Sequence, residues 1–176
     1  MPSARYARRI FHAPDDLLAL VENVEAYPEF VNLISALRIT RREDISPMHT
    51  HFEAEALVAY KMINERFAST VDVLRDQHRI EVRKSERGGA LKHLENIWTF
   101  HPLPDGSTLV QFDIDVRLKA FFLDSLLAQK FDSAAQAVIK AFEARAAQLA
   151  QPAGERDYDA GADIARLGLQ DALYEG

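Results

Sequence analysis

One uninterrupted stretch, residues 120–149, constrains the fold more than any other part of the chain. It contains neither proline nor glycine and is dense in alanine, so its helix propensity is high. Its apolar residues recur at steps of three and four positions: Leu127, Phe131, Ala134, Ala135, Val138, Ile139, Phe142, Ala146 and Leu149. At roughly 1.5 Å per residue such a helix spans ~45 Å, which is longer than a small core requires. The stretch therefore predicts one long amphipathic helix.

The residues before this helix alternate between apolar and polar side chains, as expected for strands with one buried face. In residues 109–118, Val110, Phe112 and Ile114 lie on one face and polar or charged residues lie on the other. Further strands are predicted at residues 37–42, 51–59, 65–74, 79–84 and 93–101, and Asp105-Gly106 indicates a hairpin turn.

The N-terminal part adds one strand and two short helices. Residues 4–12 alternate, Pro14 suits the first turn of a helix ending near residue 24, and a second short helix is predicted from Pro28 to Leu33. A sheet with one wet face needs a cover, and only the long helix is large enough to supply it. The order predicts an α+β fold, a curved antiparallel sheet of about six to seven strands around a long C-terminal helix.

Charge is distributed unevenly along the chain. The net charge is −6, and residues 151–176 contribute two arginines and six acids to it. We expect residues 1–150 to form a single domain and residues 151–176 to form an acidic, flexible tail. The nearly neutral remainder argues against DNA as a partner. The arginines at 5, 8, 9, 38, 41 and 42 are expected to be solvated on strand faces, with contact to anionic lipid or RNA as the alternative.

Several functional classes are excluded or disfavoured. The absence of cysteine excludes a disulfide scaffold, a thiol nucleophile and a cysteine-built metal site. No apolar run approaches the ~20 residues of a membrane span, and the N-terminus does not resemble a signal peptide, so the expectation is a cytoplasmic protein. His49 and His51 are the only close histidine pair, and no third metal ligand is evident. Without a G-x-S-x-G elbow, a glycine-rich phosphate loop or an HExxH helix, no enzyme is predicted, although an inward Glu65 leaves a cyclase open.

Residues 21–30, VENVEAYPEF, resemble a segment of the coenzyme-Q-binding proteins, a branch of the polyketide cyclase/START-like superfamily. In the same order, residues 67–69 (FAS), 94–100 (LENIWTF), 110–114 (VQFDI) and 141–145 (AFEAR) resemble further segments of that family. The resemblance covers residues 4–149. It departs at residues 89–91 (GAL), where the family usually has Gly-Pro-Phe, so the turn and one aromatic contact are expected to differ.

The resemblance implies a helix-grip fold with a cavity between sheet and helix, and ubiquinone as the ligand. It further implies a quinone chaperone that supports respiration or quinone biosynthesis, with no required cofactor, in the cytoplasm or at the inner membrane surface. A close branch of the family acts as a toxin that binds the ribosome. A ribosome-binding growth inhibitor is therefore the main alternative, and a polyketide cyclase-like enzyme is the third.

Strand and helix phase, together with this resemblance, predict nine ligand-binding residues: Tyr27, Phe30, Phe67, Asn96, Trp98, Phe112, Phe131, Val138 and Phe142. The alternative for the apolar members is a solid core. Tyr27 is expected either to hydrogen-bond a quinone carbonyl or to belong to a structural turn. Asn96 is expected to address either the ligand or the backbone. Phe121 and Phe122 either border the mouth or a membrane, or simply pack.

Overall fold

The computed structural model describes residues 3–60 and 63–174. Residues 1–2 and 61–62 of the predicted domain and residues 175–176 of the predicted tail lie outside this range. The elements follow in the order β1 (Ser3–Ile10), α1 (Pro14–Glu22), the 3-10 helix η1 (Val24–Glu29), β2 (Ile34–Ser46), β3 (His49–Tyr60), β4 (Ile63–Leu74), η2 (Arg75–Gln77), β5 (Arg79–Gly89), β6 (Leu91–Pro102), β7 (Thr108–Leu118), α2 (Phe121–Leu149), α3 (Gly161–Leu167) and η3 (Gln170–Ala172).

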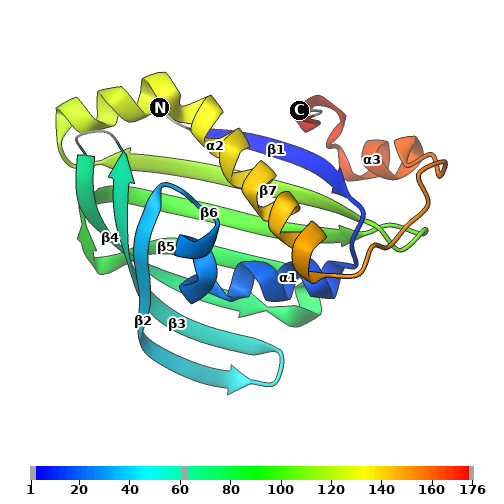
Figure 1. Cartoon of the computed structure of the whole chain (residues 1–176), viewed down its shortest axis with the longest axis horizontal. Coiled ribbons are helices and arrows are strands. Elements are labelled where there is room, and N and C mark those ends of the chain that lie inside the picture. Colours follow the sequence, from blue (N-terminus) through cyan, green and yellow to red (C-terminus); the bar gives the residue numbers. More distant parts are fainter. Residues whose placement is uncertain (1–2, 61–62, 175–176) are drawn as a thin grey trace.

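The seven strands form one antiparallel sheet in the order β1-β7-β6-β5-β4-β3-β2. Figure 1 shows α2 running along one face of this curved sheet, with α1 on the same side. The predicted α+β helix-grip fold, with two short helices after the first strand, is confirmed. Several boundaries differ. The second short helix, η1, covers Val24–Glu29 rather than Pro28 to Leu33, and β2 covers Ile34–Ser46 rather than residues 37–42. Strand β5 extends to Gly89 rather than Lys84. Gly89 pairs with Phe67 of β4 after a bulge, and this pairing continues the strand.

Helix α2 is packed unevenly along its length. Its four fully buried residues, Ala135, Ile139, Phe142 and Ala146, follow one another at steps of four, three and four and form a single stripe. None of residues 121–134, all of which the structure describes, is fully buried. The second half of α2 therefore closes the main core, while the first half lies against the sheet with half-buried side chains.

The C-terminal segment is folded against the sheet, which differs from the flexible tail expected from its composition. Leu169 is buried together with Ala7 of β1 and with Leu103 and Leu109 at the hairpin that joins β6 and β7. The main-chain N–H of Tyr174 also donates to the carbonyl of Ala7 at 2.8 Å, along the edge of β1. Burial of these apolar groups outweighs the acidic composition on which the expectation rested.

Two arginines of β1 hold this segment in place, so they are not the solvated side chains that the sequence suggested. Arg9 donates to the carboxylate of Asp105 at 2.6 Å and to the carbonyl of Tyr158 at 2.8 Å. Arg8 forms two hydrogen bonds with Glu143 of α2, at 2.8 and 2.9 Å, and a third with the carbonyl of Tyr174. The tail thus bonds through its main-chain groups to charged side chains of β1 and of the β6–β7 turn.

Candidate ligand-binding site

Five of the nine predicted residues meet in one aromatic and apolar cluster at the centre of the grip. The ring of Phe142, from the buried stripe of α2, lies 5.0 Å from the ring centroids of Tyr27, Phe30 and Trp98 in edge-on arrangements. Phe112 of β7 extends the cluster, with its ring 4.7 Å from that of Trp98. Edge-to-face packing of this kind stabilises a core beyond the apolar area that it buries.

The hydroxyl of Tyr27 forms a hydrogen bond within the protein. The phenol donates a short hydrogen bond to the main-chain carbonyl of Val21 in the last turns of α1. Burial raises the pKa of this phenol, so the proton stays on the oxygen. Its position comes from η1, in which the carbonyl of Tyr27 accepts the N–H of Val31 and so turns the chain toward β2. Tyr27 thus holds the chain between α1 and β2 in place, and its hydroxyl proton is already used in a hydrogen bond within the protein.

Asn96 is the polar residue on the inward face of β6, and its amide has protein partners on both sides. Its Nδ2 donates to the main-chain carbonyl of Asp113 at 2.9 Å, and its Oδ1 accepts the indole N–H of Trp98 at 3.0 Å. The amide therefore fixes the orientation of the Trp98 ring. Of the two alternatives for Asn96, this arrangement matches the backbone contact.

The remaining predicted residues lie away from the aromatic centre. Phe67 and Phe131 pack on a separate cluster with Leu91, Val116 and Leu118, under the first half of α2. Val138 lies between the two, half-buried against the main core. The predicted set is therefore split between a tightly closed region and a loosely covered one.

The cavity at the centre of the grip is small. Its volume is about 10 Å³, and it is lined by residues of α1 that the sequence analysis did not single out, Leu17, Leu20 and Val21, together with Trp98 and Phe142. Such a volume holds at most about one water molecule, whereas ligand pockets typically measure about 300–1,000 Å³. At the centre of the grip, within the residues that the structure describes, the interlocked aromatic rings fill the space, which matches the alternative of a solid core rather than the expected ready-made cavity. The three α1 residues follow the 3.6-residue period, which was the available signal for them.

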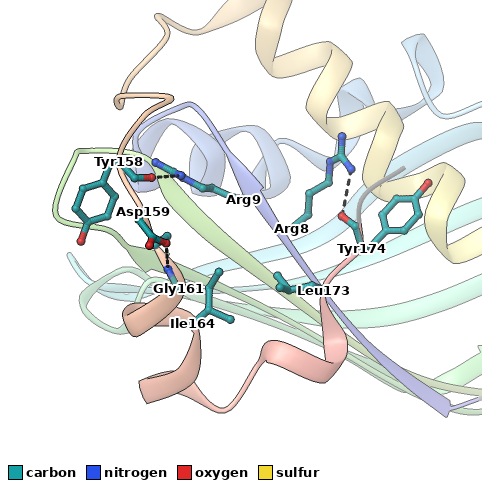
Figure 2. Close-up of a pocket in the computed structure, with 9 residues that line it drawn as sticks. Arg8, Arg9, Tyr158, Asp159, Gly161, Ile164, Leu173 and Tyr174 are labelled. Carbon is teal, nitrogen blue, oxygen red and sulfur yellow. Dashed lines mark hydrogen bonds between the residues drawn. The ribbon is translucent and has the colours of Figure 1, made fainter.

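A larger cavity lies outside the grip, between β1 and the C-terminal segment (Figure 2). It measures about 530 Å³, and Tyr158, Ile164 and Leu173 are among its lining residues. Arg8 and Arg9 also line it, but their guanidinium groups already bond carboxylates and carbonyls of the protein. This cavity is the space that remains between β1 and the C-terminal segment, because that segment is bonded to β1 near Tyr158 and near Tyr174.

The described residues contain no cluster of three or more histidines and acids that would suit a metal ion. His49 and His51 both bond one oxygen of Asp72, each at 2.8 Å. Burial alone would raise the pKa of Asp72, but the hydrogen bonds from the two imidazoles outweigh it and lower the pKa. This pair therefore links β3 to β4 on the sheet.

A family model described as "Polyketide cyclase / dehydrase and lipid transport" matches residues 10–143. The chain belongs to this family. The match covers all the strands except most of β1, and it covers α2 through Phe142 of the buried stripe, but it ends before the C-terminal segment.

Two curated relatives carry the name ribosome association toxin RatA. The one from Rickettsia prowazekii is 27% identical over 85% of this chain and 99% of its own length. The one from Pseudomonas aeruginosa is 28% identical over 76% of this chain and 87% of its own length.

Solved structures share the fold. An 18 kDa protein from Caulobacter crescentus is 35% identical, with a TM-score of 0.70 over 85% of this chain and 98% of that one. A START superfamily protein from Mycobacterium smegmatis is 21% identical, with a TM-score of 0.69 over 84% of this chain and 98% of that one. An aromatase/cyclase from a Streptomyces species is 12% identical, with a TM-score of 0.67 over 83% of this chain and 93% of that one. The last two support the fold alone.

Proposed function

We propose that this protein binds a hydrophobic ligand between the first half of α2 and the sheet, that the ligand is ubiquinone, and that the protein acts as its chaperone without a covalent step. The family includes lipid transport in its description. The resemblance of residues 21–30 to the coenzyme-Q-binding proteins favours a quinone over other lipids.

The uneven packing of α2 is the observation that carries this proposal. A ligand enters a closed grip only if one element moves, and the element that moves should be the one with the least buried area. All fully buried residues of α2 fall in its second half, so the first half can separate from Phe67, Leu91 and Val116 while Phe142 stays in place. The space released is lined by apolar side chains, which suit a prenyl tail.

In the part of the chain that the structure describes, the centre of the grip, apart from the proposed binding space, offers no acid–base pair of its own. The residues around the small cavity include no titratable side chain, so the cavity supplies no acid–base pair for catalysis. The polar groups next to it, the phenol of Tyr27 and the amide of Asn96, already bond the protein.

The test is uptake of ubiquinone by protein purified without detergent. Trp98 is the single tryptophan and lies in the core, so quenching of its fluorescence by a short-tail ubiquinone reports binding directly. We expect saturable quenching in the wild type and binding weakened at least about tenfold in Phe131→Ser, since losing one large apolar contact costs on the order of 1.5–3 kcal/mol. Leu149→Ser, an exposed position on the same helix, is the control. Wild-type protein that takes up no ubiquinone, where a known quinone binder does, would refute the proposal.

A ribosome-binding growth inhibitor is the second candidate, because two curated relatives are named for ribosome association. It predicts that overproduction converts assembled ribosomes into free subunits. Sucrose gradients of lysates distinguish the two candidates: unchanged subunit profiles with bound quinone favour the carrier, and shifted profiles without quinone favour the toxin.

A further inference from the structure

The first turn of α2 exposes two adjacent aromatic side chains. Phe121 is 85% and Phe122 is 69% exposed, the highest values among the large apolar residues that the structure describes. Leu123 and Leu126 follow them and are half-buried. One exposed aromatic residue is ordinary on a protein surface, but two neighbours backed by leucines form an apolar patch that calls for a partner.

Two lysines, Lys119 and Lys92, lie near this patch. The N–H of Lys119 donates to the carbonyl of Ala90 at 3.0 Å, and the N–H of Ala90 donates to the carbonyl of Arg66 at 3.0 Å, so three segments of the chain meet here. Lys92 lies close enough to lower the pKa of Asp124, after the larger effects of Arg117 and a main-chain N–H. We call Phe121, Phe122, Lys119 and Lys92 the helix-start surface.

The charge at this end is opposite to that of the whole protein. Residues 64–66, 84–92 and 117–124 contain six lysines and arginines but three acids, whereas the chain as a whole carries −6. Arg117 is paired with Asp124 at 2.8 Å, and Arg66 is paired with Glu55 of β3 at 2.9 Å. The basic character of this end therefore comes from Lys84, Arg87, Lys92 and Lys119. The molecule is therefore polarised, with a basic and aromatic end.

We propose that the helix-start surface docks on a bilayer that contains anionic lipids. The two phenyl groups would enter the interface between headgroups and acyl chains, and the basic side chains would face the lipid phosphates. The apolar patch favours a bilayer over RNA, because leucine-backed phenyl groups gain by entering acyl chains, while phosphate contacts need only the charges. Docked in this way, the loosely covered first half of α2 would lie next to the membrane.

Vesicle flotation with the full chain tests this proposal. The probes are vesicles of phosphatidylcholine alone and vesicles of phosphatidylcholine with an equal part of phosphatidylglycerol. We expect flotation with the anionic vesicles, weakened by high salt because the charge contribution is screened. Phe121→Ser with Phe122→Ser should lower the partition coefficient at least about tenfold. Lys92→Glu with Lys119→Glu should abolish the preference for anionic vesicles.

Matched controls separate this surface from general stickiness. Leu149→Ser removes an apolar residue that is 64% exposed at the opposite end of α2, and Arg41→Glu reverses a charge on the exposed strand β2. Both controls should float like the wild type. Absence of flotation with anionic vesicles, or flotation of the double Phe variant at the wild-type level, overturns the proposal. Flotation of the double lysine variant with the wild-type preference for anionic vesicles also overturns it.

The result of the flotation test does not depend on whether the protein binds ubiquinone. Flotation without any quenching of Trp98 by ubiquinone would leave the membrane surface standing and remove the quinone carrier. Quenching without flotation would do the reverse.

Discussion

Asp105→Asn is expected to detach the C-terminal segment from the sheet. The side chain of Asp105 is 1% exposed and accepts hydrogen bonds from Arg9 at 2.6 Å, the Ser107 hydroxyl at 2.7 Å and the N–H of Glu155 at 2.8 Å. Asparagine keeps one acceptor oxygen but turns an NH₂ group toward these donors, and it leaves the Arg9 guanidinium without its carboxylate.

The size of the effect follows from the burial of the pair. Removing one partner of a buried ion pair costs ~3–5 kcal/mol. Arg9 keeps the carbonyl of Tyr158 as an acceptor, so we expect a value at the lower end, about 3 kcal/mol. This loss of free energy weakens the local attachment of the tail. It corresponds to about a hundredfold increase in the population of the detached state.

Amide hydrogen exchange across residues 153–174 measures the detachment. Exchange in this segment should accelerate about a hundredfold in Asp105→Asn, while the urea midpoint reported by Trp98 moves much less. Asp157→Asn makes the same chemical change at an exposed position of the same segment and should leave exchange unchanged. Wild-type protection of the tail in Asp105→Asn would show that the carboxylate does not hold it.

The same group predicts a dependence on pH. Burial alone would raise the pKa of the Asp105 carboxyl, but hydrogen bonds from Ser107, Glu155 and Arg9 hold that pKa well below its usual range. An aspartate in the unfolded chain titrates near pH 4, so the stabilisation is complete above about that pH and declines as the pH falls below it. The difference in tail exchange between wild type and Asp105→Asn should therefore shrink as the solution is acidified.

Three further substitutions and one control test other parts of the structure. Gly154→Ala would place a Cβ 2.6 Å from the Cβ of Ser107 and should deprotect the tail in hydrogen exchange, whereas Gly168→Ala, at a similarly left-handed residue with nothing within 4 Å of its Cβ, should cost only backbone strain. Phe142→Ala should lower the free energy of unfolding in urea by ~3–5 kcal/mol, because it empties the centre of the core. Tyr27→Phe leaves a main-chain carbonyl without its donor and should cost ~1–3 kcal/mol in the same assay. An unchanged urea midpoint in either of the last two variants would contradict the assigned packing.

Much of the fold was predictable because strand and helix periods are local properties of the sequence. Phe112 and Trp98 follow the alternation of their strands, and Phe142 follows the helical period of α2, so all three point inward as expected. The closed centre was not predictable in the same way. Whether inward aromatic rings enclose a space or fill it depends on their mutual angles, which the sequence pattern does not contain.

The packing of the tail was missed for a similar reason. Its attachment depends on Arg9 and Asp105, which are about a hundred residues apart and were interpreted separately, one as a solvated arginine and the other as part of a turn. The acidic composition of residues 151–176 suggested flexibility, although Leu169 supplies the apolar contact that orders it. Each side of the interaction was visible in the sequence, but their proximity was not.

The position of β1 in the sheet has a consequence for how the chain is made. It is the first of the seven strands to leave the ribosome, yet Tyr6 pairs with Phe112 of β7, and its other edge is met by Tyr174. Both neighbours of β1 are therefore synthesised about 100 or more residues later. Until then the strand presents unpaired main-chain groups that other chains can join. We expect slow folding and dependence on chaperones during translation, since the earliest strand is completed by the latest segments.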